Sequence, residues 1–415
     1  SDVCSSDLRS RARTWSSAAA GSTSARSSPA DGRARTIGTY GGYLLVGLGA
    51  GGTLAALALG LVLTYRASGV VNFAHAAVGT YLAFAFFELR QHGDLVLPVL
   101  GLPARLHLVD RPTVATAWMT CMLLAALVGL AIHLLVFRPL RTAPPLARII
   151  ASLGLLLYFQ EMTRLRFGGG GGAAIFEIGD LLPSGAVRVA GVAVPTNRFV
   201  LARLAVAVAL ILGAVFRWTR FGLATRAATE NERGAVLAGL SPDRLAAVNW
   251  IVATMLSGAA VILIASVTKQ LDVTTTSLLV VPALAAALLG GMTSFTITTA
   301  AGLGIGMAQA ALLHFATVSS SIPSWLPRAG IPAALPFLAI LVAITLRGRA
   351  LPTRGALEEP FHPSAPAPRH PVRWTLAGAA VAITLLLTTD GSWRLALIVS
   401  MIAAIISLSS VVLTG

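Results

Sequence analysis

The stretch VVNFAHAAVGTYLAF, Val70–Phe84, suits a membrane helix except for two polar residues, Asn72 and His75. A polar group left unsatisfied in lipid is costly, so polar residues within membrane helices almost always face the interior of a helical bundle. Asn72 and His75 are three residues apart and would share one face of a helix. Gly79 follows them closely, which is consistent with a broken or closely packed helix.

The composition of the whole chain indicates the same environment. Of its 415 residues, 56% are hydrophobic and only 11% are charged, whereas a soluble domain carries about 25% charged residues. A hydrocarbon layer about 30 Å thick requires roughly 20 apolar residues per helix, with every backbone group bonded within the segment. Apolar segments lie near residues 43–65, 70–89, 113–137, 146–163, 199–216, 247–267, 278–292, 296–315, 331–346, 374–389 and 393–413. We therefore predict an all-α fold, a polytopic transmembrane helix bundle in contact with membrane lipid.

The net charge of +15 could indicate nucleic-acid binding, but the distribution of the basic residues argues against it. Lys269 is the only lysine, and the arginines occur in short clusters between apolar segments. Bacterial inner-membrane proteins place cytoplasmic loops in this way. We predict no nucleic-acid partner and a multi-pass protein of the bacterial cytoplasmic (inner) membrane, with the Arg-rich loop 217–246 on the cytoplasmic side. If the membrane segments alternate in direction, counting them back from this loop places the Arg-containing N-terminal tail outside. Basic residues are expected on the cytoplasmic side, so the side of the membrane on which the N-terminus lies stays open.

Composition divides the chain into four regions. Residues 1–37, rich in Ser, Ala and Arg, are predicted to be a disordered or non-native tail. Residues 38–349 hold about nine membrane segments and form a first unit. The hydrophilic, proline-rich stretch 350–373 is predicted to be a cytoplasmic linker, and residues 374–415 the truncated start of a second unit.

The sequence lacks the motifs of common catalytic sites. The pentaglycine Gly168–Gly172 is not followed by lysine, so it does not form a phosphate-binding P-loop. G-x-S-x-G, H-E-x-x-H and C-x-x-C motifs are absent, and His75, His133 and His314 lie on different segments. We predict that the chain is not an enzyme, needs no cofactor and binds no metal. Energy from ATP would have to come from another polypeptide.

The cytoplasmic loop 217–246 contains the pattern of a short amphipathic helix. Small or apolar residues alternate with charged ones over residues 222–239, and Gly239 and Pro242 mark its end. Such a helix could dock into a groove on a soluble partner. An ordinary solvated loop explains the same pattern equally well on physical grounds.

Four segments resemble, in family order, the ABC permeases for branched-chain amino acids. NFAHAAVGTYLAF is similar to the NFAHG-type stretch after that family's first helix, and FRPLRTAPPLARIIASLGLLLYFQE to its RPLR loop and next helix. GLATRAATENERGAVLAGLSPDRLAAVNWIVATMLSGAAVIL resembles its coupling loop and following helix. ALAAALLGGMTSFTITTAAGLGIGMAQAAL resembles its Leu-Gly-Gly hairpin. Segments after the linker, up to SLSSVVLTG, resemble the start of the partner permease, which implies a fusion of two permease subunits truncated early in the second.

The resemblance implies a permease that forms the translocation path of an ATP-driven importer. Its partners would be two separate ABC ATPase subunits, an extracytoplasmic substrate-binding protein and a second permease unit, fused or separate. ATP-driven closure of the ATPase pair would move the coupling helices and switch the path between outward and inward access. The candidates for ATPase coupling are then Arg226, Glu230, Glu232, Arg233 and Gly239.

The resemblance also gives roles to the polar and small residues of the membrane segments. Asn72, His75 and Gly79 are candidates for a broken helix near the translocation path, and a purely structural interhelical hydrogen bond is the alternative. The glycines interpreted as helix-packing residues are Gly290, Gly291, Gly302 and Gly306.

Two further transporter classes compete with this interpretation. An ABC permease for urea or a simple sugar would have a related fold. An ion-coupled secondary transporter would need acidic or polar residues at the membrane midplane. The segments hold few polar residues and no buried aspartate, which counts against ion coupling.

Overall fold

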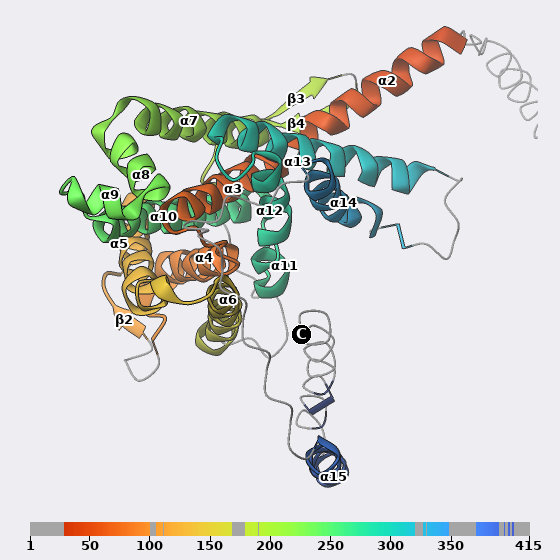
Figure 1. Ribbon diagram of the computed structural model, residues 1–415. Helices are drawn as coiled ribbons and strands as arrows, with labels where there is room; N and C mark the ends of the chain where they lie inside the picture. Colours follow the sequence, from red (N-terminus) through yellow and green to blue (C-terminus); the bar gives the residue numbers. More distant parts are fainter. Residues whose placement is uncertain are drawn as a thin grey trace, which may run out of the picture. The chain divides into compact units, whose positions relative to one another are not determined.

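The computed structural model describes residues 29–99, 105–110, 112–167, 179–189, 191–319, 327–328, 330–347 and 371–389, together with residues 394, 397, 398 and 401 (Figure 1). Its α-helices are α2 (Pro29–Val46), α3 (Leu48–Ser68), α4 (His75–His92), α5 (Val114–Ile132), α6 (Pro145–Phe167), α7 (Thr196–Trp218), α8 (Arg220–Glu230), α9 (Glu232–Leu237), α10 (Pro242–Thr268), α11 (Val273–Ser277), α12 (Val280–Leu289), α13 (Phe295–Val318), α14 (Gly330–Arg347) and α15 (Pro371–Thr388). A π-helical turn, η1 (His133–Phe137), and a 3₁₀ turn, η2 (Pro139–Thr142), extend α5. Two antiparallel hairpins complete the described part: β1 (Asp94–Val96) with β2 (Arg105–His107), and β3 (Ala186–Val189) with β4 (Val192–Pro195).

The chain separates into two compact units, residues 1–355 and 356–415. The second unit contributes α15 to the described part. Most of the predicted tail 1–37 and of the predicted linker 350–373 lies outside the described residues, as does the pentaglycine.

Six of the described helical segments are long and apolar enough to cross a membrane. They are Gly38–Ser68, Val114–Phe137, Leu146–Phe167, Thr196–Trp218, Pro242–Thr268 and Phe295–Val318. The prediction of a polytopic helical membrane protein is therefore confirmed. The two short hairpins are the departure from an all-helical chain.

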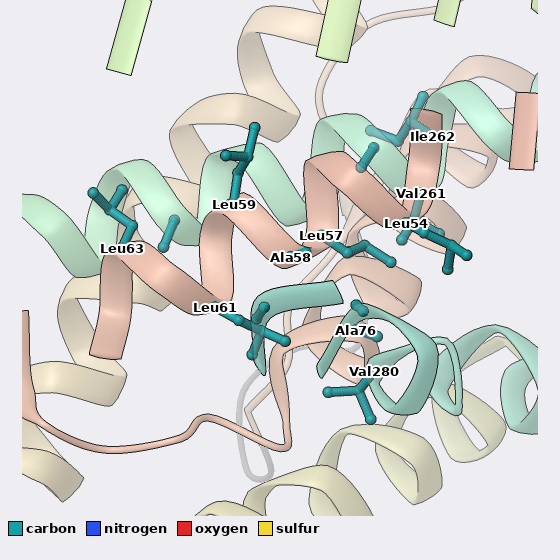
Figure 2. Close-up of a cluster of buried hydrophobic side chains, with 14 of the residues drawn as sticks. Leu54, Leu57, Ala58, Leu59, Leu61, Leu63, Ala76, Val261, Ile262 and Val280 are labelled. Atoms are coloured by element: carbon teal, nitrogen blue, oxygen red, sulfur yellow. The ribbon is translucent and has the colours of Figure 1, made fainter. Parts of the chain in front are cut away.

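Helix α3 lies at the centre of the first unit and packs against α4, α7, α10, α12 and α13. Leu57, Leu59, Leu61 and Leu63 are almost completely buried although they point to different sides of the helix. Figure 2 shows these leucines among side chains contributed by neighbouring helices, including Val280 of α12. A helix that is apolar all round can be buried in this way only when other helices surround it.

Small residues let α13 approach α3 closely. A Cβ atom added at Gly302 would lie 2.7 Å from Ala55 Cα, and one added at Gly306 would overlap the backbone of Gly51. Contacts of this kind permit tight helix packing in lipid, where no hydrophobic force drives helices together.

The turn between α12 and α13 is sharp and contains two consecutive residues with positive φ. These are Gly291 (φ 69°) and Met292 (φ 56°). A Cβ at the neighbouring Gly290 would overlap Thr298 Oγ1 at the start of α13. Arg66, at the end of α3, donates to the carbonyl oxygen of Thr293 at 3.1 Å and so ties this turn to the central helix.

Candidate functional site

The stretch that contains Asn72 is a break between two helices. Gly69 ends α3 in the left-handed conformation, with φ 67°, and α4 begins only at His75. Between them, Asn72 Oδ1 accepts a hydrogen bond from Ala74 N at 3.1 Å, and Asn72 O accepts one from His75 N at 3.3 Å. These two hydrogen bonds stabilise the non-helical backbone before α4, as asparagine does in turns.

His75 and Gly79 lie in the contact between α4 and α10. Ser257 Oγ of α10 donates to His75 O at 2.6 Å. A Cβ at Gly79 would lie 2.5 Å from Ser257 Oγ and 2.8 Å from Ser257 O. The interhelical hydrogen bond at this point is thus made by Ser257 to the backbone, not by the side chains of Asn72 or His75.

The imidazole of His75 is 2% exposed and packs against Gly60 of α3. Its Nε2 has no hydrogen-bond partner among the described residues. Asn72 is likewise only 3% exposed. Both polar residues face the interior of the bundle formed by this chain.

The helix predicted over residues 222–239 is two helices, α8 and α9, separated by Asn231. Asn231 has extended backbone (φ −145°, ψ 96°), and its Oδ1 accepts from Gly234 N at 2.9 Å. Thr219 caps α8 in the same way through Gly222 N at 3.2 Å. A single helix was the wrong prediction because asparagine is a strong N-cap residue, and here it starts a new helix.

Gly239 ends α9 in the left-handed conformation, with φ 79°. Gly239 N donates to Val236 O at 3.0 Å, and Leu240 N donates to Ala235 O at 2.9 Å. This is the bonding pattern of a glycine-terminated helix. It allows the chain to turn directly into α10.

The two short helices bury small residues and expose large ones. Ala228 and Ala235 are 2% and 4% exposed. Leu237 is 90% exposed, Leu223 62% and Val236 55%. We call Leu223, Val236 and Leu237 the loop surface. The residues predicted for coupling from the sequence were charged ones and Gly239, and they did not include these three apolar residues.

Of the predicted coupling residues, Glu232 is paired within the chain. Arg141 Nη1, in the loop after α5, lies 3.5 Å from Glu232 Oε1 and 3.1 Å from Asp243 Oδ1. Arg138 Nε lies 3.6 Å from Asp243 Oδ2. These four side chains join the α8–α9 loop to the α5–α6 loop. The remaining candidates differ in exposure: Arg226 is partly buried, whereas Glu230, Arg233 and Gly239 are exposed.

Arg66 lies beside the α8–α9 loop and was not predicted to have a role. Its guanidinium carbon is 4.8 Å from the ring centre of Phe216 and 5.2 Å from that of Phe295. A guanidinium stacked on aromatic faces is stabilised by the ring quadrupoles. Arg66 thereby connects the ends of α3 and α7 with the start of α13. The sequence offered one signal for this residue: Arg66 is a basic residue directly after an apolar segment.

Within the described residues, no group of three or more His, Cys, Asp or Glu side chains could hold a metal ion. No hydrogen bond among the described residues of this site pairs a side-chain nucleophile with a side-chain base. What the arrangement offers is an exposed apolar surface on a polar loop, joined by ion pairs to a neighbouring loop.

Comparison with known proteins gives one consistent result. The family model described as "Branched-chain amino acid transport system / permease component" matches residues 43–344. The high-affinity branched-chain amino acid transport system permease protein LivH of Salmonella typhimurium is 25% identical over 267 residues, which cover 64% of this chain and 83% of that protein. BraD of Pseudomonas aeruginosa, with the same description, is 26% identical over 274 residues, covering 64% and 84%. A solved structure, PsaBC from Streptococcus pneumoniae in complex with Fab, aligns with 76% of this chain and 93% of that chain, with 13% identity and a TM-score of 0.38, too low to indicate a shared fold.

Proposed function

The chain belongs to the family of permease components of branched-chain amino acid transport systems, and on that premise we propose that it imports branched-chain or related amino acids with energy from separate ATPase subunits. It is a transport component and a multi-pass protein of the inner membrane. The relatives named above are permeases for branched-chain amino acids, which favours that substrate class over urea or simple sugars.

The observation that carries the proposal is the loop surface. Leu237, Leu223 and Val236 are exposed on the same loop as the exposed polar residues Glu230, Asn231 and Arg233. A membrane helix has reason to expose leucine to lipid, but a cytoplasmic loop does not. Clusters of exposed apolar residues with a polar rim mark protein interaction sites. The partner we propose is an ABC ATPase subunit, which would receive α9 in a groove.

The ion pairs supply a route from that partner into the membrane domain. Movement of α9 would carry Glu232, and Glu232 is joined through Arg141 to Asp243 at the start of α10. Helix α10 packs against α3, α4 and α5. A displacement of the loop would therefore act on the helices at the centre of the bundle. The number of ATPase subunits and the use of an extracytoplasmic binding protein and a second permease unit belong to the same proposal.

The first experiment measures uptake into right-side-out proteoliposomes that contain the full chain, its ATPase subunits and its partner permease. ATP is enclosed, and the binding protein and radiolabelled leucine are added outside. Uptake should require ATP and the binding protein, survive ionophores, and be reduced by valine but not by urea or ribose. Uptake that follows an ion gradient without ATP would contradict the proposal.

Crosslinking tests the docking of α9 separately. Leu237→Cys, introduced together with Cys4→Ser, should crosslink to a cysteine placed in the groove of the ATPase subunit. Cys121 is buried and needs no replacement. Val187→Cys, exposed on β3 and distant in sequence from the loop, is the matched control and should not crosslink.

A further inference from the structure

A cavity of about 350 Å³ lies at the end of α10 that is farthest from the loop surface. Helix α10 has 27 residues, so this end is about 40 Å from the end that carries α8 and α9, at a rise of 1.5 Å per residue. Residues from α3, α10, α11, α12 and α13 line the cavity. With α8–α9 on the cytoplasmic side, the cavity is on the extracytoplasmic side. Its volume is in the range of sites for small molecules.

One wall of the cavity is polar and accepts hydrogen bonds. Among the described residues that line the cavity, Asp272 is the charged one, and Thr53 and Gln309 are uncharged. Thr53 Oγ1 already donates to Gly49 O at 3.2 Å, and Gln309 Nε2 donates to Pro332 O at 3.2 Å. Both side chains therefore keep oxygen lone pairs that can accept a further hydrogen bond.

Asp272 is held in a fixed position. Its Oδ1 accepts a hydrogen bond from Thr275 N at 2.6 Å, so that Asp272 caps α11. The hydrogen bond from the backbone of Thr275 lowers the pKa of Asp272 below its ordinary value. The carboxylate is consequently ionised at neutral pH. Arg164 acts on Asp272 through its charge, but among the described residues no arginine or lysine lines the cavity, so the carboxylate favours a positively charged ligand group there.

Other lining residues are apolar, among them Leu54 of α3, Ile264 of α10 and Leu279 between α11 and α12. Leu54 is 2% exposed. The cavity therefore combines one anionic point with branched aliphatic side chains, the complement of an ammonium group attached to a branched aliphatic chain.

We propose that this cavity is an amino-acid site within the permease, in which Asp272 binds the ammonium group and Leu54, Ile264 and Leu279 contact the side chain. Thr53 and Gln309 accept hydrogen bonds from the remaining ammonium protons. The site receives the amino acid at the outer end of the bundle, before it moves toward the cytoplasmic side. This inference rests on the proposed function, since it assigns a place in the permease to the same substrate.

Asp272→Asn is the decisive variant, because asparagine caps a helix as well as aspartate and keeps the bond to Thr275 while removing the charge. In the proteoliposomes described above, leucine uptake should fall by about tenfold or more. ATP hydrolysis stimulated by the leucine-loaded binding protein should remain, so more ATP is consumed per leucine. Ala50→Leu, at an exposed cavity-lining position, should lower uptake in the same way by filling the space.

Asp110→Asn is the matched control, since Asp110 is an exposed carboxylate before α5 that lines no part of this cavity. Uptake by Asp272→Asn equal to that of Asp110→Asn would overturn the site. That result would leave ATP-driven uptake by the wild type intact. Failure of the wild type to use ATP and the binding protein would instead overturn the proposed function.

Discussion

Two regions of this chain reverse the usual distribution of polar and apolar side chains, and they do so in opposite directions. Before α4, Asn72 and His75 lie in an apolar interior with 3% and 2% of their surface exposed. On α9, Leu237 lies in a polar loop with 90% exposed. The first region places polar groups where apolar ones are expected, and the second does the converse.

The two regions differ in how much of their surface this chain covers. Asn72 bonds to the backbone of Ala74, and Ser257 bonds to the backbone of His75, whose Nε2 has no partner among the described residues. Leu237 projects away from the buried alanines of the same loop and stays uncovered by the described residues. The buried Asn72 explains the local fold. For the exposed leucine of the α8–α9 loop, our proposal supplies a partner.

The largest effect is expected from a larger side chain at Gly79, in the close contact between α4 and α10. Gly79→Val would bring side-chain atoms against Ser257 and Val261, where a Cβ alone lies 2.5 Å and 2.9 Å from the nearest atoms. Overpacking of this kind costs about 1–3 kcal/mol and occasionally more. The purified variant should unfold at a lower temperature by circular dichroism, or fail to accumulate in the membrane. Gly304→Ala, at a helical glycine with nothing within 4 Å, should fold as well as wild type, and equal behaviour of the two variants would contradict the close packing.

The next effect separates two asparagines whose side-chain oxygens accept a backbone hydrogen bond, Asn72 in the turn before α4 and Asn231 as the N-cap of α9. Asn72→Ala should lower the free energy of unfolding by about 1 kcal/mol, because it leaves Ala74 N–H buried without its acceptor. Asn231→Ala removes the equivalent bond to Gly234 N, but on an exposed loop. It should loosen α9 and weaken ATPase binding with little change in the unfolding temperature. If both variants reduced stability alone, the two regions would not differ in the way described.

A smaller effect is expected at Glu232. Its contact with Arg141 is a partly exposed ion pair, which contributes about 0–1 kcal/mol. Glu232→Gln should reduce the ATPase-driven uptake rate less than Arg141→Gln, because Arg141→Gln loses contacts with both Glu232 and Asp243. The comparison is made in proteoliposomes at matched protein content. A larger loss for Glu232→Gln than for Arg141→Gln would indicate that Glu232 pairs with the ATPase instead.

The smallest effect concerns the β1–β2 hairpin, in which the exposed His107 of β2 pairs with Asp94 of β1. A hydrogen bond with Asp94 raises the pKa of His107 above its ordinary value of 6.5. A raised pKa means that the folded hairpin binds the proton more tightly than the unfolded one. Its stabilising contribution is fully present below pH 6.5 and is lost as the pH rises through the pKa of the folded state. Titration of the His107 ring by NMR should give a midpoint above 6.5 that Asp94→Asn lowers, and a wild-type midpoint at or below 6.5 would contradict the pairing.

The sequence predicted the general architecture well because composition and segment length determine it. The low fraction of charged residues and the repeated apolar segments predicted a bundle of membrane helices. The interruption at Asn72 was also visible, since a polar residue in an apolar run marks a point where the helix either breaks or packs against protein. The division of residues 222–239 by Asn231 could have been predicted from its capping preference, which the amphipathic pattern obscured.

The exposed side of α9 could not be predicted. Periodicity identifies two faces of a helix but does not say which of them the rest of the same chain covers. Ala228 of α8 and Ala235 of α9 are buried against the rest of the chain, whereas Leu237 of α9 is exposed. The pairing of Glu232 with Arg141 was inaccessible for a related reason, because it depends on a tertiary contact between loops far apart in the sequence.

One measurement tests the contrast between the two regions directly. Binding of the purified ATPase subunit to the permease in nanodiscs, and the unfolding temperature of the permease, are both determined for Leu237→Asp and Asn72→Ala. Loss of a central apolar contact typically costs about 2 kcal/mol or more, or roughly 30-fold in affinity. Leu237→Asp should therefore weaken ATPase binding by that order and leave the unfolding temperature unchanged, and Asn72→Ala should do the reverse. ATPase binding by Leu237→Asp at wild-type affinity would contradict the assignment of the loop surface as the docking site.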